Sequence, residues 1–323
     1  MQETVTPAIS VVIPTYNRAN TIKYCLDSVL AQTYSPLEVI IVDDCSTDDT
    51  VQVVKNYLDP RVRCIVLEKN SGAQAARNCG IQEAKGDWIA FQDSDDEWMA
   101  DKLEKQVHAL AKVDFNPWVV VHTNCITLEV STGCEQLLNI PAVEGSDGYR
   151  ALLSHPGPMF QGMLVSRRAL QEIGFLDEKV LAFQEWDTAI RLGKHCRFIY
   201  LGEPLFTYYL HQGETISKNK KKDIQGYLYI LNKFQNEIKV LCGQKVWEEH
   251  LWGQLYKCLE LGLWKESGIF FRKISSRKVL KFNLRLLRRL HVKPSQMKAS
   301  LSRMKRKVHS IKRNSLIEKG RKL

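Results

Sequence analysis

The fold is decided by the stretch Ile9-Ser10-Val11-Val12-Ile13-Pro14-Thr15-Tyr16-Asn17-Arg18, near the start of the chain. Its first five residues are almost wholly apolar, and a proline follows them. A short apolar run of this kind is typical of a strand that is buried on both faces, as in a parallel sheet covered by helices. The polar residues after the proline would then lie beyond the carboxyl end of that strand.

The segment up to residue 91 continues to alternate between strand-like and helix-like patterns. Asn20 can cap a first helix, whose apolar residues recur at helical spacing. Ser46 and Asp49 form a capping-box pattern that predicts a second helix, running through Leu58. The alternation predicts an α/β fold with a mostly parallel, Rossmann-like sheet flanked by helices. We expect strands at 9–13, 39–42, 62–67 and 88–91, and a third helix at 72–84.

The pattern changes beyond residue 101. A helix around Leu103 leads to an apolar strand, and residues 123–160 then show weak periodicity broken by glycine and proline. We expect this segment to be rich in loops and to shape a pocket. From Asp223 onward the pattern is helical, which predicts C-terminal helices. The other elements expected are strands at 118–121, 160–165, 197–201 and 206–210, and helices at 167–173 and 185–192.

The composition of the 323 residues, 44% hydrophobic and 25% charged, is that of a globular protein, and the length suggests two domains. No apolar run approaches the length of about 18 residues that a membrane span needs. Residues 1–6 show no basic leader region, so we expect no signal peptide. The nine cysteines are scattered without CxxC spacing, which argues against a disulfide framework and fits a reducing cytoplasm.

The charge of the chain is unevenly distributed. Residues 272–323 hold 19 Lys and Arg and one acidic residue, a net charge of +18, whereas residues 1–271 carry −8. Because apolar residues interleave with these bases, the segment is typical of an amphipathic element drawn to an anionic membrane surface. Nucleic-acid binding and a merely solvated tail are the alternatives. Nucleic acid is not expected, because no recognised fold for it accompanies the charge.

Polar and acidic side chains follow three of the predicted strands. They are Thr15 to Arg18, Asp43-Asp44, and Asp93-Ser94-Asp95-Asp96. In open parallel sheets ligands bind beyond the carboxyl ends of the strands, so we expect these groups to meet at one edge. Clustered carboxylates repel one another unless a cation is present. Bound Mg2+ or Mn2+ would make the acidic loop a clamp for a diphosphate.

Four motifs, taken together, resemble the family 2 glycosyltransferases, which are inverting enzymes of GT-A fold that use nucleotide sugars. The motifs are SVVIPTYNR (10–18), IVDDCSTD (41–48), GAQAARNCG (72–80) and DSDD (93–96). The resemblance is close over 9–103 and loose as far as 217. It implies a glycosyltransferase domain at 1–217, with a nucleotide-sugar-binding half at 1–115 and an acceptor-binding half at 116–217, then a helical extension at 218–271 and the basic tail at 272–323.

The resemblance implies how the nucleotide is bound. Pro14 and Tyr16, together with Asn17, would line the pocket for the base and the ribose. Asp44 would accept a hydrogen bond from the ring NH of a pyrimidine. Arg77 would lie near the diphosphate or the base, where its planar fork suits phosphate oxygens.

The resemblance also implies roles for the acidic loop and for a late histidine. Asp93 would face the ribose, and Asp95 would ligate the metal. Asp96 is either a group behind the metal site or the cap of the following helix. His211 resembles the family's histidine that reaches the metal or the diphosphate, although a lone histidine is more often an ordinary surface or core residue.

The catalytic base is expected in the segment FQEWDTAIRL (183–192). Inversion by direct displacement needs one base to take the proton of the acceptor hydroxyl. The family usually places an Asp where this chain has Glu185, and the longer side chain can do the same chemistry. We favour Glu185 over Asp187 as the base, with Asp187 as a helix cap or acceptor contact. Arg191, four residues further on, is the expected ion-pair partner of Asp187.

These observations predict a metal-dependent inverting glycosyltransferase that moves a sugar from a nucleotide donor, most simply UDP-linked, to a glycan or lipid-linked acceptor. Synthesis of a cell-surface polysaccharide would be its setting. We expect a cytoplasmic protein, peripheral at the inner face of the cell membrane. The alternative is a binding protein of the same fold that has lost most of its catalysis and attaches to membrane or nucleic acid through its tail.

Overall fold

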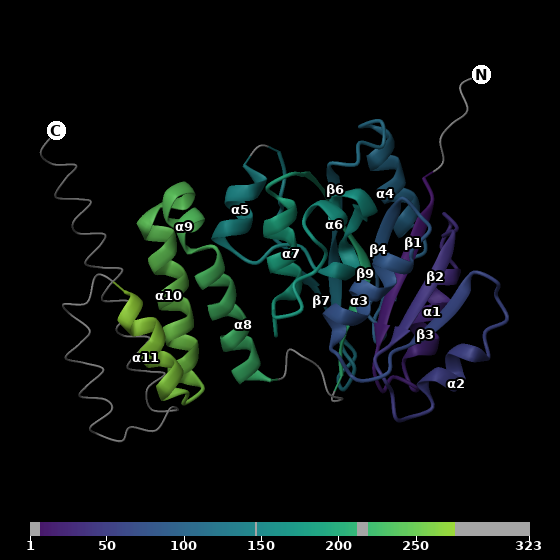
Figure 1. The fold of residues 1–323 in the computed structure, drawn as a ribbon, viewed down its shortest axis with the longest axis horizontal. Coiled ribbons are helices and arrows are strands. Elements are labelled where there is room, and N and C mark those ends of the chain that lie inside the picture. The colour runs from purple at the N-terminus through teal and green to yellow at the C-terminus, as the bar shows by residue number, and fades with distance from the viewer. Residues whose placement is uncertain (1–6, 146, 212–218, 275–323) are drawn as a thin grey trace, which may run out of the picture. The chain divides into compact units, whose positions relative to one another are not determined.

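The computed structural model describes residues 7–145, 147–211 and 219–274. Contacts divide these residues into two compact units (Figure 1). The first holds the described residues up to 211 together with 225–234, and the second holds 219–224 and 235–274. The predicted site residues all lie in the first unit.

The first half of unit 1 is a parallel α/β layer, as the sequence predicts. Four strands lie in the order β3-β2-β1-β4, and all three neighbouring pairs are parallel. Helices connect them, and the buried face of the first helix packs on the sheet through residues such as Leu26. The elements are β1 (Ile9–Thr15), α1 (Ile22–Leu30), β2 (Glu38–Asp43), α2 (Thr50–Lys55), β3 (Val62–Val66), α3 (Ala73–Glu83) and β4 (Trp88–Phe91).

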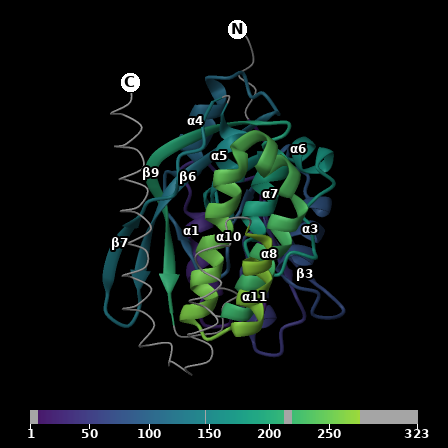
Figure 2. The same ribbon diagram turned by 90° about the vertical axis from the view of Figure 1, so that its left-hand side faces the viewer.

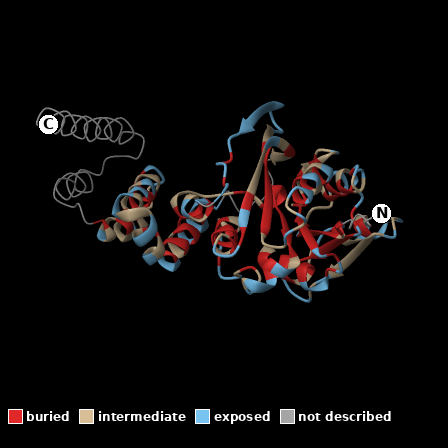
Figure 3. Ribbon diagram, turned by 90° about the horizontal axis from the view of Figure 1, so that it is seen from above, coloured by how far each residue is buried: buried red, intermediate tan, exposed pale blue. Residues whose placement is uncertain are grey.

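The burial of these strands explains why they were predictable. Every residue of β1 and β2 is buried, so apolar residues line both faces of each strand. Figure 3 shows that the interior of unit 1 is made of buried residues. Helix α3 lies so close to the sheet at Gly80 that a Cβ atom there would overlap the side chain of Val12. That close approach fixes the position of α3, which carries Arg77.

The sheet continues in the second half of unit 1 with mixed strand directions. Strand β8 pairs antiparallel with both β4 and β6, while β6 and β9 are parallel. In the described residues nine strands form one sheet, which matches the fold class expected above. The remaining elements of this half are β5 (Glu97–Trp98), α4 (Lys102–Ala111), β6 (Val119–Glu129), β7 (Cys134–Leu138), α5 (Gly148–Ser154), η1 (Phe160–Gly162), β8 (Leu164–Ser166), α6 (Arg167–Glu172), α7 (Gln184–Leu192) and β9 (Arg197–Leu210).

Residues 123–160 are more regular than predicted. Strand β6 extends to Glu129 and forms a hairpin with β7, and α5 follows. All five residues of β7 are exposed, so this strand lacks the apolar alternation that sequence reading depends on (Figure 3). The two strands expected at 197–201 and 206–210 are one strand, β9, whose register against β6 shifts where Pro204 pairs with Asn124 (Figure 2).

Two predicted helix starts were wrong. Helix α1 begins after Thr21 rather than after Asn20, and α2 begins after Asp49; the side chains of these two N-cap residues accept no capping hydrogen bond. The capping box does not form because the Ser46 hydroxyl donates to the carboxylate of Asp43, 2.5 Å away. Helix α2 also ends at Lys55, so Leu58, expected on its apolar face, is 95% exposed.

Helices follow β9, as predicted. Most of the basic tail lies outside the described residues. Of the helices in the part of the chain that the structure describes, none is both long and apolar enough to cross a membrane. The helices are α8 (Lys220–Lys233), α9 (Gln235–Glu237), the π-helical η3 (Ile238–Cys242), α10 (Gly243–Glu260) and α11 (Trp264–Lys273).

Candidate active site

The loops after β1 and β4 meet at the carboxyl edge of the sheet. These two strands are parallel neighbours, so the residues that follow them lie side by side. Arg18, from the loop after β1, places its Nε atom 3.2 Å from Oδ2 of Asp95, in the acidic loop after β4. The expected convergence of the two loops is therefore observed.

His211 reaches the same oxygen from the end of β9. Its Nε2 atom lies 3.0 Å from Oδ2 of Asp95, and the two side chains are 19% and 16% exposed. A carboxylate and an imidazole, both partly exposed, thus lie in contact, and they are the two residues proposed from the sequence as metal ligands. The role of the pair as metal ligands remains a prediction.

Asp95 and His211 could hold a hard divalent cation only if a substrate supplied further oxygen ligands. Among the described residues no group of three His, Cys, Asp or Glu side chains is arranged to hold a metal ion. Mg2+ is commonly held by one or two carboxylates together with substrate phosphates and water. Asp95 and His211 would supply two ligands, and the remaining positions would fall to a diphosphate and to water.

Arg77 faces into the protein rather than toward solvent. It is 4% exposed, and its NH2 atom lies 2.6 Å from Oδ1 of Asp93. The guanidinium lies 4.4 Å from the centroid of the Phe160 ring, and NH1 donates to Oε1 of Gln184 at 3.2 Å. Arg77 therefore supports Asp93 from behind and connects it to the first turn of α7.

Asp96 is the most deeply buried acid of the loop, at 1% exposure. It does not cap a helix, because β5 and Asp101 separate it from α4. Its Oδ1 accepts a hydrogen bond from the backbone N–H of Tyr209, at 2.9 Å. Burial raises the pKa of Asp96 well above its ordinary value, and the nearby Asp95 and Asp93 carboxylates raise it further.

Gln161 was not predicted, although it holds two of the acids. Its Nε2 atom donates to Oδ2 of Asp93 at 2.8 Å and to Oδ2 of Asp96 at 2.6 Å. Burial also raises the pKa of Asp93, an effect that the Arg77 cation opposes. A single glutamine in an irregular turn has no periodic signal, and its partners lie far away in sequence, so sequence reading could not find it.

The nucleotide side of the edge is built from β1, β2 and the start of α3. Pro14 is buried in β1 opposite Val42, and Tyr16 is 40% exposed at the rim. Both oxygens of Asp44 accept backbone N–H groups, from Ser71 at 2.6 Å and from Gly72 at 2.7 Å. These bonds fix the carboxylate against the loop that precedes α3.

Asn17 joins the loops after β1 and β2. Its backbone has a left-handed φ of 51°, a conformation in which asparagine is favoured over most residues. Its Oδ1 atom accepts a hydrogen bond from the backbone of Thr47 at 2.8 Å, and its own N–H donates to the hydroxyl of Ser46 at 2.8 Å. In the structure Asn17 therefore shapes the rim of the site.

Glu185 and Asp187 lie in the first turn of α7 but in different surroundings. Glu185 is half-buried, one residue after the Gln184 that bonds to Arg77. Asp187 is fully buried, with Oδ2 2.8 Å from Nε of Arg191 and Oδ1 2.7 Å from Nζ of Lys233. The ion pair with Arg191 is confirmed, and two cations occupy both oxygens of Asp187.

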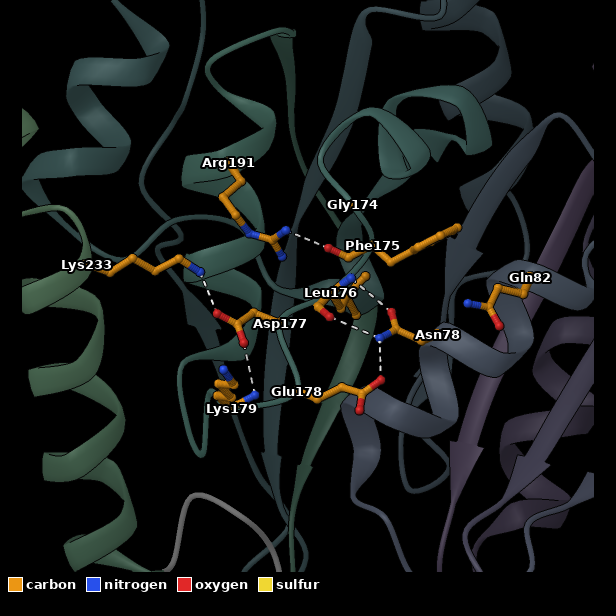
Figure 4. A pocket seen from close by; sticks show the side chains of 10 residues that line it. All are labelled: Asn78, Gln82, Gly174, Phe175, Leu176, Asp177, Glu178, Lys179, Arg191 and Lys233. Carbon is orange, nitrogen blue, oxygen red and sulfur yellow. Dashed lines mark hydrogen bonds and ion pairs between the residues drawn. The ribbon is translucent and has the colours of Figure 1, made fainter.

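A pocket of about 450 Å³ lies away from these residues, between α3 and the loop before α7 (Figure 4). Three of its charged groups, Asp177, Arg191 and Lys233, are already bonded to one another or to the backbone. Lys233 contacts Asp177 at 2.6 Å, and Arg191 donates to the carbonyl of Phe175 at 2.6 Å. The residues that line it are Asn78, Gln82, Gly174, Phe175, Leu176, Asp177, Glu178, Lys179, Arg191 and Lys233. None of the predicted site residues is among them, so we do not place the donor there.

Comparisons with known proteins agree with this geometry. Residues 10–134 match the family model described as glycosyl transferase family 2. The chain is 32% identical over 222 residues, 67% of its length, to the Escherichia coli protein "UDP-Glc:alpha-D-GlcNAc-diphosphoundecaprenol beta-1,3-glucosyltransferase WfaP", and covers 82% of that protein.

Two further proteins extend the comparison. TuaG of Bacillus subtilis, whose name assigns it to teichuronic acid biosynthesis, is 48% identical over 103 residues, which are 31% of this chain and 41% of TuaG. The chain thus spans less than half of TuaG in that match. The crystal structure of Staphylococcus aureus TarS 1–349 superposes with a TM-score of 0.61 at 19% identity, covering 84% of this chain and 82% of TarS 1–349. The TarS likeness supports the GT-A fold.

Proposed function

The chain belongs to glycosyl transferase family 2, and from that premise we propose that it transfers a sugar, with inversion, from a nucleotide-diphosphate donor to a lipid-linked glycan. The observation that carries the proposal is the meeting of Arg18, Asp95 and His211 at one oxygen atom. The printed name of WfaP supports UDP-glucose as a donor and a diphosphoundecaprenol-linked sugar as an acceptor. Synthesis of a cell-surface polysaccharide is the corresponding setting.

The donor would bind along the edge formed by β1, β2 and β4. Tyr16 offers an exposed ring at the rim for the base and the ribose, beside Pro14 and Asn17. Asp44 would accept from the ring NH through a lone pair that its backbone bonds leave available. Asp93, held by Arg77, would face the ribose.

Asp95 and His211 would hold Mg2+ or Mn2+ together with the diphosphate oxygens. The cation, when bound, stabilises negative charge on the departing diphosphate. Arg18 is the cationic side chain beside it, and its guanidinium would pair with phosphate oxygens once they approach Asp95.

Glu185 would act as the general base and take the proton of the acceptor hydroxyl as that oxygen attacks the anomeric carbon. Glu185 directly follows Gln184, which accepts a hydrogen bond from Arg77, and Arg77 also bonds to Asp93. This chain of contacts supports a place for Glu185 near the bound sugar donor. Asp187 is a poor alternative, since two cations hold its buried carboxylate. We assign Asp187 to the stability of α7.

The test is UDP release from a panel of UDP-sugars, with a GlcNAc-diphosphate-lipid as acceptor and with Mn2+ or a chelator present. We expect turnover with Mn2+, and a loss of at least about 100-fold in kcat for Asp95→Asn. Asp101→Asn is the matched control, because Asp101 is an exposed acid of the same region that pairs with Lys105.

Two outcomes would contradict the proposal. Turnover at the wild-type rate in Asp95→Asn would show that Asp95 does not hold a metal ion needed for catalysis. Tight binding of UDP without turnover of any donor would support the alternative, a binding protein of the same fold.

A further inference from the structure

We propose that Gln161 is a positioning residue for the donor, because its buried amide holds two of the three loop carboxylates in fixed places. The proposal rests on the proposed function. Gln161 is 2% exposed, and its single Nε2 atom lies 2.8 Å from Asp93 and 2.6 Å from Asp96. Each of the two N–H bonds of the amide group can thus serve one carboxylate.

An uncharged hydrogen-bond donor suits position 161 better than a charged one. Asp93, Asp95 and Asp96 lie within four residues, and their mutual repulsion must be offset for the loop to keep its shape. A lysine or arginine at 161 would offset one of the three negative charges and weaken the attraction of the cluster for a divalent cation. A glutamate would add one more acid. The amide of Gln161 supplies two hydrogen bonds and leaves the charge of the loop unchanged.

The loop is fixed because each of these two carboxylates has both oxygens occupied. Asp93 bonds to Arg77 through Oδ1 and to Gln161 through Oδ2. Asp96 bonds to the N–H of Tyr209 through Oδ1 and to Gln161 through Oδ2. The third acid, Asp95, bonds instead to Arg18 and His211, whose side chains are partly exposed. Gln161 therefore anchors the residues on both sides of Asp95.

The position of Gln161 is itself fixed by its neighbours in η1. The ring of Phe160 lies under the Arg77 guanidinium and packs on Phe91, with ring centroids 5.1 Å apart. The carbonyl of Gly162 accepts a hydrogen bond from Nε2 of Gln106, at 2.9 Å. These contacts on both adjacent residues hold the backbone at Gln161 in place. A fixed backbone is what a positioning role for its side chain requires.

The experiment compares Gln161→Met and Gln161→Glu with the parent chain. Methionine keeps the length of the side chain and removes both hydrogen bonds, whereas glutamate keeps the shape and adds an acid. Gln136→Met is the matched control, because Gln136 lies on the exposed strand β7. The measurements are the Kd of UDP by calorimetry with Mn2+ present, the KM of the donor, the KM of the acceptor, kcat and Tm.

We expect Gln161→Met to raise the Kd of UDP and the KM of the donor about tenfold, with smaller changes in kcat and in the KM of the acceptor. Gln161→Glu should also raise the Kd of UDP, because a carboxylate at 161 repels Asp93 and Asp96 where the amide holds them, which displaces the loop. A parental Kd and donor KM in Gln161→Met would overturn the proposal. Failure of both variants to fold would also overturn it, because the role would then be structural. A parent chain that binds UDP without turnover would contradict the proposed function alone, and the calorimetric series would still test Gln161.

Discussion

Glu185 and Asp187 lie two residues apart on α7 and should respond in opposite ways when their charges are removed. Glu185→Gln removes the proposed base from a half-buried position, so we expect kcat to fall about 100- to 10,000-fold with little loss of stability. Asp187→Asn removes the partner of two cations inside the protein, so we expect it to destabilise unit 1 and to leave the chemical step intact.

The size of the effect at Asp187 follows from its contacts. Removing one partner of a buried ion pair typically costs about 3–5 kcal/mol, because the other charge is left without compensation. Here Arg191 keeps its bonds to the carbonyls of Ile173 and Phe175, and Lys233 keeps Asp177. We therefore expect the lower end, about 3 kcal/mol, which corresponds to a fall of about 6–12 °C in Tm for a unit of this size.

Thermal and urea unfolding, together with UDP release at a temperature where both variants are folded, measure these effects. Glu172→Gln is the matched control, since Glu172 is an exposed acid on the neighbouring helix α6. A Tm within about 2 °C of the parent and a loss of turnover in Asp187→Asn, combined with normal turnover in Glu185→Gln, would refute the reasoning. The base would then be Asp187.

Two further predictions concern stability and the tail. Burial lowers the pKa of His122 to about 4, so the unfolded chain binds this proton more strongly, and stability should fall by up to about 3 kcal/mol as the pH drops from 6.5 to 4. His122→Phe should flatten the dependence of the urea midpoint on pH over that interval, and an unchanged slope would exclude His122 as its source. Removal of the basic tail, residues 272–323, should abolish binding to anionic liposomes at low salt and preserve UDP release with a soluble acceptor. Retained liposome binding would exclude the tail as the membrane element.

The parallel half of the fold was predictable because each strand there is buried on both faces. The continuous apolar runs that form β1 and β2 fit neither a solvated loop nor a strand with one polar face, so they predict strands buried on both faces. The hairpin of β6 and β7 gives no such signal. All of β7 is exposed, and its pairing is set by backbone hydrogen bonds to β6 that no side-chain pattern reports.

The site was predictable where motifs follow strands and not where a contact joins distant segments. The meeting of Asp95 with Arg18 follows from the parallel pairing of β1 and β4, which the alternation of strands and helices implies. Gln161 lies 65 residues from Asp96 and belongs to a three-residue turn. Its role depends on the path of the chain between β6 and β8, which the weak periodicity of 123–160 leaves open.

The acidic loop also shows how adjacent, chemically identical residues acquire different roles. Asp93 is held by a cation and an amide, Asp96 by an amide and a backbone N–H, and Asp95 by groups that reach it at the rim. The first two sets of partners come from buried segments, so a ligand cannot displace them without disturbing the core. The partners of Asp95 are partly exposed and can exchange. If a cation and a diphosphate bind here as proposed, Asp95 is therefore the acid that can change partners, while its neighbours keep it in place.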